Sequence, residues 1–196
     1  FPNTRTGNNY KVKRMGKQKV IMLLITYKCN LRCSYCYEPK VSNFKMSAAK
    51  AKSIIQEQME ALGDDYEAVE IQFMGGEPLL EFPLIKECAE WLWSTPVTNK
   101  QMMLFAPTNG TLLTDDMKGW FAKNKDRIHL GLSFDGDMAM QNANRSSSFH
   151  NVDLDFFVNT WPKQSVKMTI SPDTISNMAE GVKFLHHNRV RSEERF

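Results

Sequence analysis

Strand-length apolar runs alternate with helix-length segments along most of this chain. The strands are predicted at 20–26, 68–74, 101–106, 127–133 and 166–170. A helical crossover separates each run from the next, and such crossovers join strands that lie parallel in one sheet. The alternation therefore predicts an α/β fold, in which about five β/α units build a parallel sheet covered by helices.

Local signals support the individual elements. The first run, at 20–26, is apolar on both faces, which is typical of a strand buried on both sides. Ser47 and Thr114 are suitable helix N-caps. Helices are predicted at 47–62 and 82–94, from Thr114 onward, near 153–160 and at about 176–188. Residues 135–150 are predicted to form a long polar loop.

Length and composition are those of one globular domain. The chain has 196 residues, of which 42% are hydrophobic and 24% charged. Its net charge of +3 is too small to indicate nucleic-acid binding, and no apolar run approaches the ~20 residues of a membrane span. We therefore expect a cytoplasmic protein with neither nucleic acid nor membrane as partner. It divides into a basic arm at 1–19, a core at 20–188 and a polar tail at 189–196.

Three of the four cysteines, Cys29, Cys33 and Cys36, fall within eight residues. In a cytosolic protein such a group indicates a metal site more than a disulfide framework. Thiolates suit both iron–sulfur clusters and zinc. Three cysteines leave one iron of a 4Fe–4S cluster open for a substrate or cofactor, whereas structural zinc needs a fourth ligand, from Cys88 or a histidine. The spacing favours the cluster, because zinc explains none of the other motifs.

Polar motifs also follow the other predicted strands. They are Gly75-Gly76-Glu77-Pro78 after the second strand, Asn109-Gly110 after the third, and Ser133 with Asp135 at the end of the fourth. The carboxyl ends of parallel strands meet at one edge of a sheet, where α/β proteins carry their chemistry. We therefore expect these motifs to share one site with the cysteines.

The cysteine run, with an aromatic residue just before the third cysteine and Gly-Gly-Glu-Pro about forty residues later, closely resembles the radical S-adenosylmethionine superfamily. The resemblance extends over 20–188. It implies a partial (β/α)6 barrel and a 4Fe–4S cluster on Cys29, Cys33 and Cys36. It also implies S-adenosylmethionine bound through the open iron, whose reductive cleavage gives a 5′-deoxyadenosyl radical that abstracts a hydrogen atom.

The same resemblance implies a set of residues that bind S-adenosylmethionine. They are Tyr35, Gly75, Gly76, Glu77, Pro78, Asn109, Ser133 and Arg145. Glu77 would accept hydrogen bonds from the ligand's ammonium group, and Arg145 would pair with its carboxylate. The alternatives are a core aromatic, a strand-end serine, a solvated arginine and a turn asparagine. Gln72 and Asp135 are expected to face the cavity, although Asp135 is equally suited to a turn.

The wording of the motifs is most similar to the branch that modifies peptides and proteins, which includes the anaerobic sulfatase-maturating enzymes. That likeness implies a peptide or protein substrate and an electron donor such as flavodoxin or ferredoxin. The SPASM or twitch domain of that branch carries auxiliary clusters, but no cysteine follows Cys88 here. A sixth strand is not expected. The alternatives are a glycyl-radical activase and a non-catalytic scaffold that bears a cluster or zinc.

Overall fold

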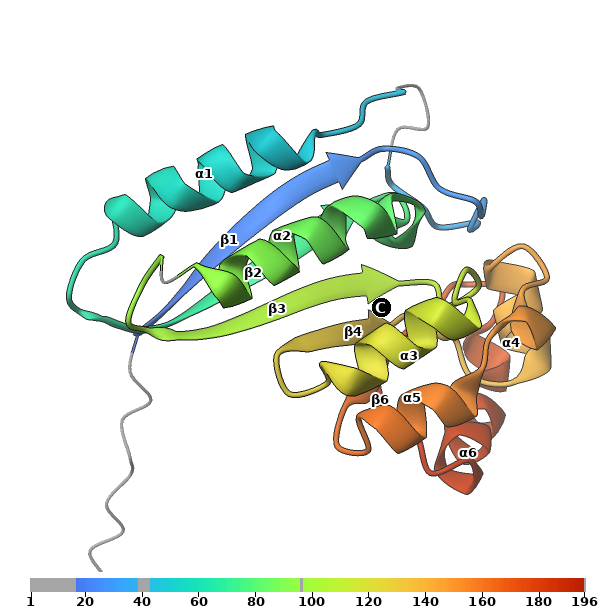
Figure 1. Cartoon of the computed structure of the whole chain (residues 1–196). Coiled ribbons are helices and arrows are strands. Elements are labelled where there is room, and N and C mark those ends of the chain that lie inside the picture. Colours follow the sequence, from blue (N-terminus) through green and yellow to red (C-terminus); the bar gives the residue numbers. More distant parts are fainter. Residues whose placement is uncertain (1–16, 39–42, 96, 196) are drawn as a thin grey trace, which may run out of the picture.

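The computed structural model (Figure 1) describes residues 17–38, 43–95 and 97–195, the last five of them by their backbone alone. Most of the basic arm expected at 1–19 lies outside these residues. Among the described residues, no helix is both long and apolar enough to cross a membrane.

Four parallel strands form the main sheet in the order β1-β2-β3-β4. They are β1 (Lys17–Thr26), β2 (Tyr66–Gly75), β3 (Gln101–Thr108) and β4 (Ile128–Leu132). A second parallel pair consists of β5 (Ser165–Thr169) and β6 (Arg191–Arg195). A bridge between Ser133 and Lys167 joins the two sheets, and Phe134 N–H donates to the Lys167 carbonyl at 2.9 Å. The pair β5 and β6 therefore extends the main sheet beyond β4, and the strands form a partial barrel, as predicted.

Helices α1, α2 and α3 lie along one face of the main sheet (Figure 1). The α-helices are α1 (Ala48–Glu60), α2 (Phe82–Ser94), α3 (Asp115–Lys123), α4 (Met138–Asn144), α5 (Leu154–Thr160) and α6 (Met178–His187). Short 3-10 turns are η1 (Pro78–Glu81), η2 (Phe149–Asn151) and η3 (Ile175–Asn177). Both predicted caps are confirmed, since the Ser47 and Thr114 side chains accept hydrogen bonds from backbone N–H groups in the first turns of α1 and α3.

The core lies between the sheet and these helices, so only one face of β1 is buried. Ile21, Leu23 and Ile25 point into the core and are at most 5% exposed. Val20 and Met22 point the other way and are 42% and 66% exposed. The expectation that this strand is buried on both faces is therefore wrong, because helices cover one side of it only.

Two further segments differ from the sequence expectation. The loop predicted at 135–150 contains α4 and η2. Asp137 begins α4 by accepting a hydrogen bond from Met140 N–H at 2.9 Å, and the helix buries Met140 and Gln141. The tail predicted at 189–196 contains β6, which pairs with β5 in parallel register. Five β/α units are thus followed by a sixth strand.

Gly131 in β4 leaves room for the ring of Phe105 on the neighbouring strand. A Cβ atom there would lie 2.3 Å from Cζ of Phe105. We expect Gly131→Ala to displace that ring and to lower the free energy of unfolding by about 1–3 kcal/mol. The measurement is the midpoint of urea unfolding of the metal-free protein, followed by circular dichroism.

Gly119→Ala in α3 is the matched control, because nothing lies within 4 Å of a Cβ at that position. Alanine is the better helix former, so this variant should gain up to about 1 kcal/mol. Equal midpoints for Gly131→Ala and Gly119→Ala would contradict the packing described here.

Candidate functional site

The cysteine loop leaves β1 and carries three thiols. Cys29 and Cys33 are half-buried and Cys36 is exposed, each as a thiol rather than a disulfide. Burial raises the pKa of the Cys33 thiol, the Arg145 guanidinium lowers it, and the neighbouring Cys29 and Cys36 raise it again. Cys29 and Cys36 therefore both lie close enough to Cys33 to affect the charge of its thiol.

The thiols do not form a closed metal site in this conformation. Within residues 17–38, 43–95 and 97–195, no group of three or more histidine, cysteine or acidic side chains is arranged to hold a metal ion. Cys88, the cysteine considered as a fourth ligand for zinc, is fully buried in α2, and burial raises the pKa of its thiol to about 11. It belongs to the core, as its helical position predicts. Three soft donors on one loop suit an iron–sulfur cluster better than a four-ligand zinc site.

Two glycines at the end of β2, Gly75 and Gly76, allow the chain that leaves β1 to pass very close to that strand. A Cβ on Gly75 would lie 2.5 Å from the Thr26 carbonyl oxygen, and one on Gly76 would lie 2.5 Å from that of Lys28. Gly76 N–H donates to the Thr26 carbonyl at 3.0 Å, and Glu77 N–H donates to the Lys28 carbonyl at 2.8 Å. The family resemblance placed both glycines among the residues that bind the cofactor, and in the structure they lie directly against the backbone that leads to Cys29.

The Glu77 carboxylate ties the end of β2 to the end of β3. Its Oε1 accepts hydrogen bonds from the Thr108 hydroxyl at 2.8 Å and from Leu79 N–H at 3.0 Å. Its Oε2 accepts one from Asn109 N–H at 2.7 Å. Burial raises the pKa of this carboxyl, while these donors and the Arg145 charge lower it. A carboxylate has about four acceptor positions, so most of its capacity is used inside the protein. Pro78, also buried, begins η1 directly after it.

Asn109 extends this connection to the cysteine loop. Its Nδ2 donates to Asn30 Oδ1 at 2.9 Å and lies 4.0 Å from Cys29 Sγ. Its Oδ1 accepts hydrogen bonds from the backbone and side chain of Thr111. The residue is 6% exposed. The asparagine after β3 is therefore a direct neighbour of the first cysteine.

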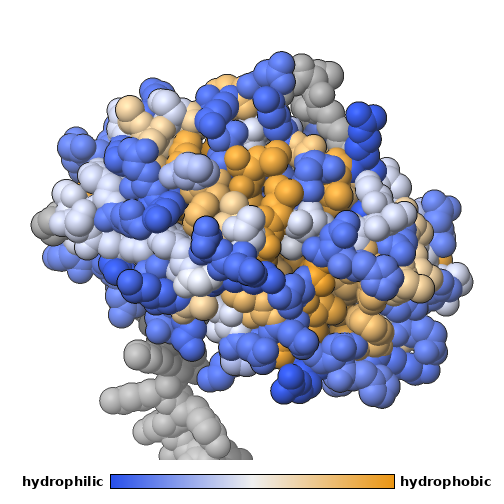
Figure 2. Space-filling model, turned by 45° about the vertical axis from the view of Figure 1, so that its right-hand side comes forward, coloured by the Kyte–Doolittle hydropathy of each residue, from blue (hydrophilic) through white to orange (hydrophobic). Residues whose placement is uncertain are grey.

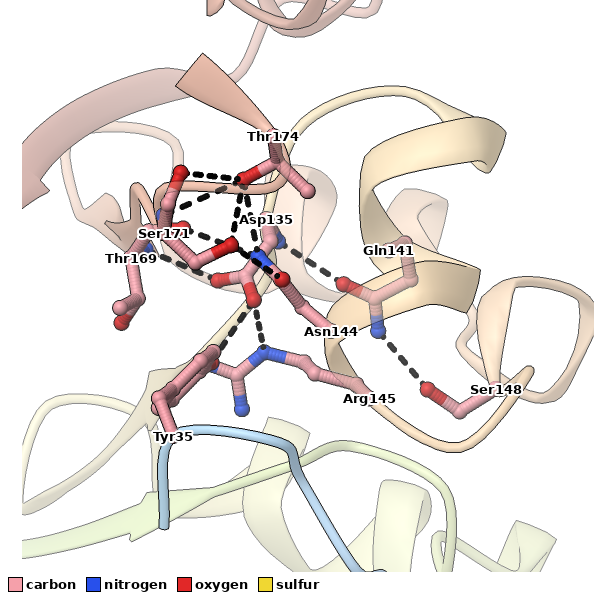
Figure 3. A network of polar contacts seen from close by, with 9 residues as sticks. All are labelled: Tyr35, Asp135, Gln141, Asn144, Arg145, Ser148, Thr169, Ser171 and Thr174. Atoms are coloured by element: carbon pink, nitrogen blue, oxygen red, sulfur yellow. Dashed lines mark hydrogen bonds and ion pairs between the residues drawn. The ribbon is translucent and has the colours of Figure 1, made fainter.

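Asp135, three residues beyond the end of β4, is the centre of a second network (Figure 3). Its Oδ2 accepts a hydrogen bond from the Tyr35 hydroxyl at 2.7 Å and lies 2.9 Å from Arg145 Nε. The Nε–H bond does not point straight at this oxygen, so the second contact is an ion pair. The Asp135 Oδ1 accepts a hydrogen bond from Thr169 N–H at 2.9 Å. Asp135 is fully buried and Arg145 is 6% exposed. The arginine is therefore not solvated, and the aspartate is more than a turn residue.

Tyr35 receives two contacts from this network. Burial is the main reason that its pKa is raised above the usual range, which keeps the hydroxyl protonated as a donor. The Arg145 guanidinium carbon lies 5.3 Å from the centre of its ring, within cation–π range. Tyr35 therefore links the cysteine loop to the segment after β4 and to the end of α4.

Helix α4 supplies contacts that the sequence analysis missed. The Gln141 side chain accepts a hydrogen bond from Asp135 N–H at 2.8 Å. The Asn144 carbonyl accepts one from Ser34 N–H at 2.9 Å, and Ser146 Oγ accepts one from Arg32 N–H at 2.8 Å. The signal that could have revealed this helix is Asp137, an N-cap residue followed by helix formers.

Ser133 and Gln72 are less closely involved. Ser133 N–H donates to the Thr108 carbonyl at 2.9 Å, and its backbone bridges to Lys167. It therefore lies where β4 meets β5. The Gln72 amide donates to Glu70 on the same strand, and Gln72 is in register with Met22 and Phe105. It is thus on the sheet face that β1 leaves exposed.

The surface around the cysteine loop carries both apolar and basic side chains. A hollow there is lined in part by Lys28, Cys29, Arg32 and Leu80. Figure 2 brings forward the end of the molecule toward which β1 and β3 point, and it shows hydrophobic residues in a band bordered by hydrophilic ones. A separate apolar pocket between α5 and the β4–β5 junction contains no cysteine.

Comparison with known proteins gives matches in sequence and in fold. The family model of the Radical SAM superfamily matches residues 23–150. An uncharacterized protein of Methanocaldococcus jannaschii is 34% identical over 118 residues, which cover 60% of this chain and 39% of that protein. A cysteine-type anaerobic sulfatase-maturating enzyme of Clostridium perfringens is 26% identical over 122 residues, which cover 60% of this chain and 32% of that enzyme. This chain thus spans less than two fifths of the length of each of these relatives.

Solved structures share the fold at low sequence identity. The structure of anSMEcpe with bound AdoMet and Kp18Cys peptide superposes with a TM-score of 0.79 at 20% identity, covering 91% of this chain and 51% of that one. Streptococcus suis SuiB bound to its precursor peptide SuiA gives 0.62 at 20% identity, covering 90% and 38%. The fold is therefore the partial radical SAM barrel. Because the family model matches well over half of its length, the chain belongs to the Radical SAM superfamily.

Proposed function

We propose that this chain is the core of an enzyme that binds a 4Fe–4S cluster on Cys29, Cys33 and Cys36 and cleaves S-adenosylmethionine reductively to modify a peptide or protein side chain. The observation that carries the proposal is the cysteine loop itself. Three thiols share this loop, and the motifs that end β2, β3 and β4 all bond to it. When bound, such a cluster supplies the electron for cleavage and an open iron that holds the cofactor.

The residues around the loop are suited to hold S-adenosylmethionine. The Arg145 guanidinium has five N–H donors, and its Nε is oriented by Asp135, so its other donors are proposed to bind the ligand's carboxylate. Glu77 retains acceptor capacity for the ammonium group. Tyr35 and Asn109 lie beside the cysteines.

The remaining members of the predicted binding set are Gly75, Gly76, Pro78 and Ser133. Gly75 and Gly76 bring the end of β2 against the cysteine loop, and Pro78 fixes the turn that follows Glu77. Ser133, at the β4–β5 junction, is proposed to contact the ribose or methionine part. Each of these assignments rests on position at a strand end, where parallel sheets bind their ligands.

A peptide or protein is the proposed substrate. The anSMEcpe and SuiB structures, which share this fold, were solved with a Kp18Cys peptide and with the precursor peptide SuiA. In the present chain, the face of β1 that the helices leave uncovered exposes Val20 and Met22, which offers apolar surface to a polypeptide. A one-electron donor such as flavodoxin or ferredoxin is the proposed second partner.

The experiment that tests the function is anaerobic. The protein is reconstituted with iron and sulfide, reduced with dithionite and mixed with S-adenosylmethionine, and 5′-deoxyadenosine is quantified. Production above the level of the cluster-free protein supports the proposal. A protein that binds zinc but assembles no cluster would overturn it in favour of a scaffold.

Replacing any one of Cys29, Cys33 or Cys36 by alanine should reduce bound iron and sulfide to background, because each removes one of only three thiolate ligands. Iron and acid-labile sulfide per chain, together with the visible absorption of the cluster, are the measurements. Cys88→Ala is the control, since this buried thiol lies in the core of α2. If a loop variant kept the full cluster, or if Cys88→Ala lost it, the ligand assignment would be wrong.

Glu77→Gln should weaken the connection between β2 and β3. The new amide nitrogen must face one of the donors that the carboxylate now accepts, which leaves a buried polar group unsatisfied and should cost about 1–3 kcal/mol of unfolding free energy. Urea unfolding measures this loss. Glu87→Gln is the control, because its ion pair with Lys52 lies near the surface and such pairs contribute under about 1 kcal/mol. Equal losses for the two variants would count against the structural role of Glu77.

A further inference from the structure

Three segments that are far apart in the sequence meet at the Asp135 carboxylate. Tyr35 comes from the cysteine loop, Arg145 from the end of α4, and Thr169 from the end of β5, and each contacts an Asp135 oxygen at 2.7 to 2.9 Å. Figure 3 shows Tyr35 and Arg145 converging on Asp135 from the same side, with Thr169 on the other. A carboxylate can accept the hydrogen bonds from Tyr35 and Thr169 and at the same time pair with the charge of Arg145.

The turn after α4 reinforces this junction. Ser146 and Ser147 both have left-handed backbone angles, with φ of 54° and 55°, which is uncommon for residues other than glycine. Such a conformation persists where surrounding contacts hold it. Here Ser146 Oγ accepts a hydrogen bond from Arg32 N–H, so the same turn that delivers Arg145 to Asp135 also holds the cysteine loop.

We propose that Asp135 is the positioning residue of this site: it fixes the cysteine loop through Tyr35 and orients the Arg145 guanidinium beside it. The inference rests on the proposed function, because it concerns where the cluster ligands and the cofactor's carboxylate partner are held. Asp135 need not touch either group. It acts because Tyr35 lies between Cys33 and Cys36 in the sequence, so a hydrogen bond to its hydroxyl restrains both neighbours.

The charge of Asp135 matters as well as its shape. Arg145 is buried, and a buried guanidinium without a counter-charge is unfavourable. In Asp135→Asn the amide oxygen can still accept the Thr169 N–H, but the amide N–H groups then face Arg145 Nε, a second donor. This variant should therefore release Arg145. Tyr35→Phe leaves the Asp135–Arg145 ion pair intact and removes the attachment of the cysteine loop alone.

The metal-free protein gives the first readout, which does not depend on a loaded enzyme. Alkylation by iodoacetamide, followed by mass spectrometry of each cysteine peptide, measures how well each thiol is protected. Half-buried Cys33 should react several-fold faster in both Asp135→Asn and Tyr35→Phe. Buried Cys88 reports global unfolding and should keep its rate. Asp137→Asn is the matched control, because asparagine caps a helix as well as aspartate does.

The reconstituted protein gives the second readout, the affinity for S-adenosylmethionine measured by equilibrium dialysis. Loss of a group that orients a ligand-binding residue typically costs about 10–100-fold. We expect a loss of that size in Asp135→Asn, a smaller one in Tyr35→Phe, and none in Asp137→Asn. The electron paramagnetic resonance signal of the reduced cluster should also shift in Tyr35→Phe.

The outcomes separate this inference from the proposed function. If the unmodified protein assembles no cluster, the proposed function fails, whatever the alkylation rates are. If the cluster forms but Asp135→Asn matches Asp137→Asn in Cys33 reactivity and cofactor affinity, the positioning role is wrong while the function stands. If Cys88 also reacts faster in Asp135→Asn, that variant has unfolded, and Tyr35→Phe decides the question. A faster alkylation of Cys33 in Tyr35→Phe, with the rate of Cys88 unchanged, supports the positioning role. An unchanged rate for Cys33 in Tyr35→Phe overturns it.

Discussion

Parallel pairing of β1 to β4 is the constraint on which this site depends. It brings four strand ends to one edge, and each end then bonds to another. Gly76 after β2 bonds to Thr26 at the end of β1, Asn109 after β3 bonds to Glu77, and Ser133 after β4 bonds to Thr108. Because these contacts form a continuous series, the cysteine loop is placed by the whole edge of the sheet and not by its own sequence alone.

Much of the fold could be predicted because its signals are local. Hydrophobic runs defined the first five strands, and Ser47 and Thr114 cap helices as expected. The missed elements depend on other parts of the chain. Helix α4 has seven residues, fewer than an isolated helix needs for stability, and it is held by the Asp137 cap and by contacts to the cysteine loop. Strand β6 pairs with β5 through backbone hydrogen bonds. Such pairing does not require apolar side chains, so the polar sequence of β6 gave no strand signal.

The location of the candidate site could be predicted from the sequence, but the hydrogen-bond partners within it could not. Strand-end position is enough to bring Glu77, Asn109 and the cysteines together. It cannot say that Glu77 bonds to Thr108, or that Asp135 accepts from Tyr35, which is 100 residues away in the sequence. Those partners depend on which loops lie side by side after folding. Glu77 and Asp135 were both candidates for contact with a ligand or substrate. In the folded chain, both carboxylates bond to other residues of the protein.

The Glu77 and Asp135 carboxylates hold the cysteine loop in place where hydrophobic packing cannot. The cysteine loop must stay partly exposed so that its thiols and any bound cofactor remain accessible, so it can bury little apolar surface to hold itself in place. Glu77 and Asp135 are both buried beneath it, where hydrogen bonds to charged groups are stronger and more directional than in water. Glu77 orders the strand ends on one side, and Asp135 holds Tyr35 and Arg145 on the other. The conformation of this partly exposed loop is thus held by hydrogen bonds and two buried carboxylates, and not by a larger apolar core.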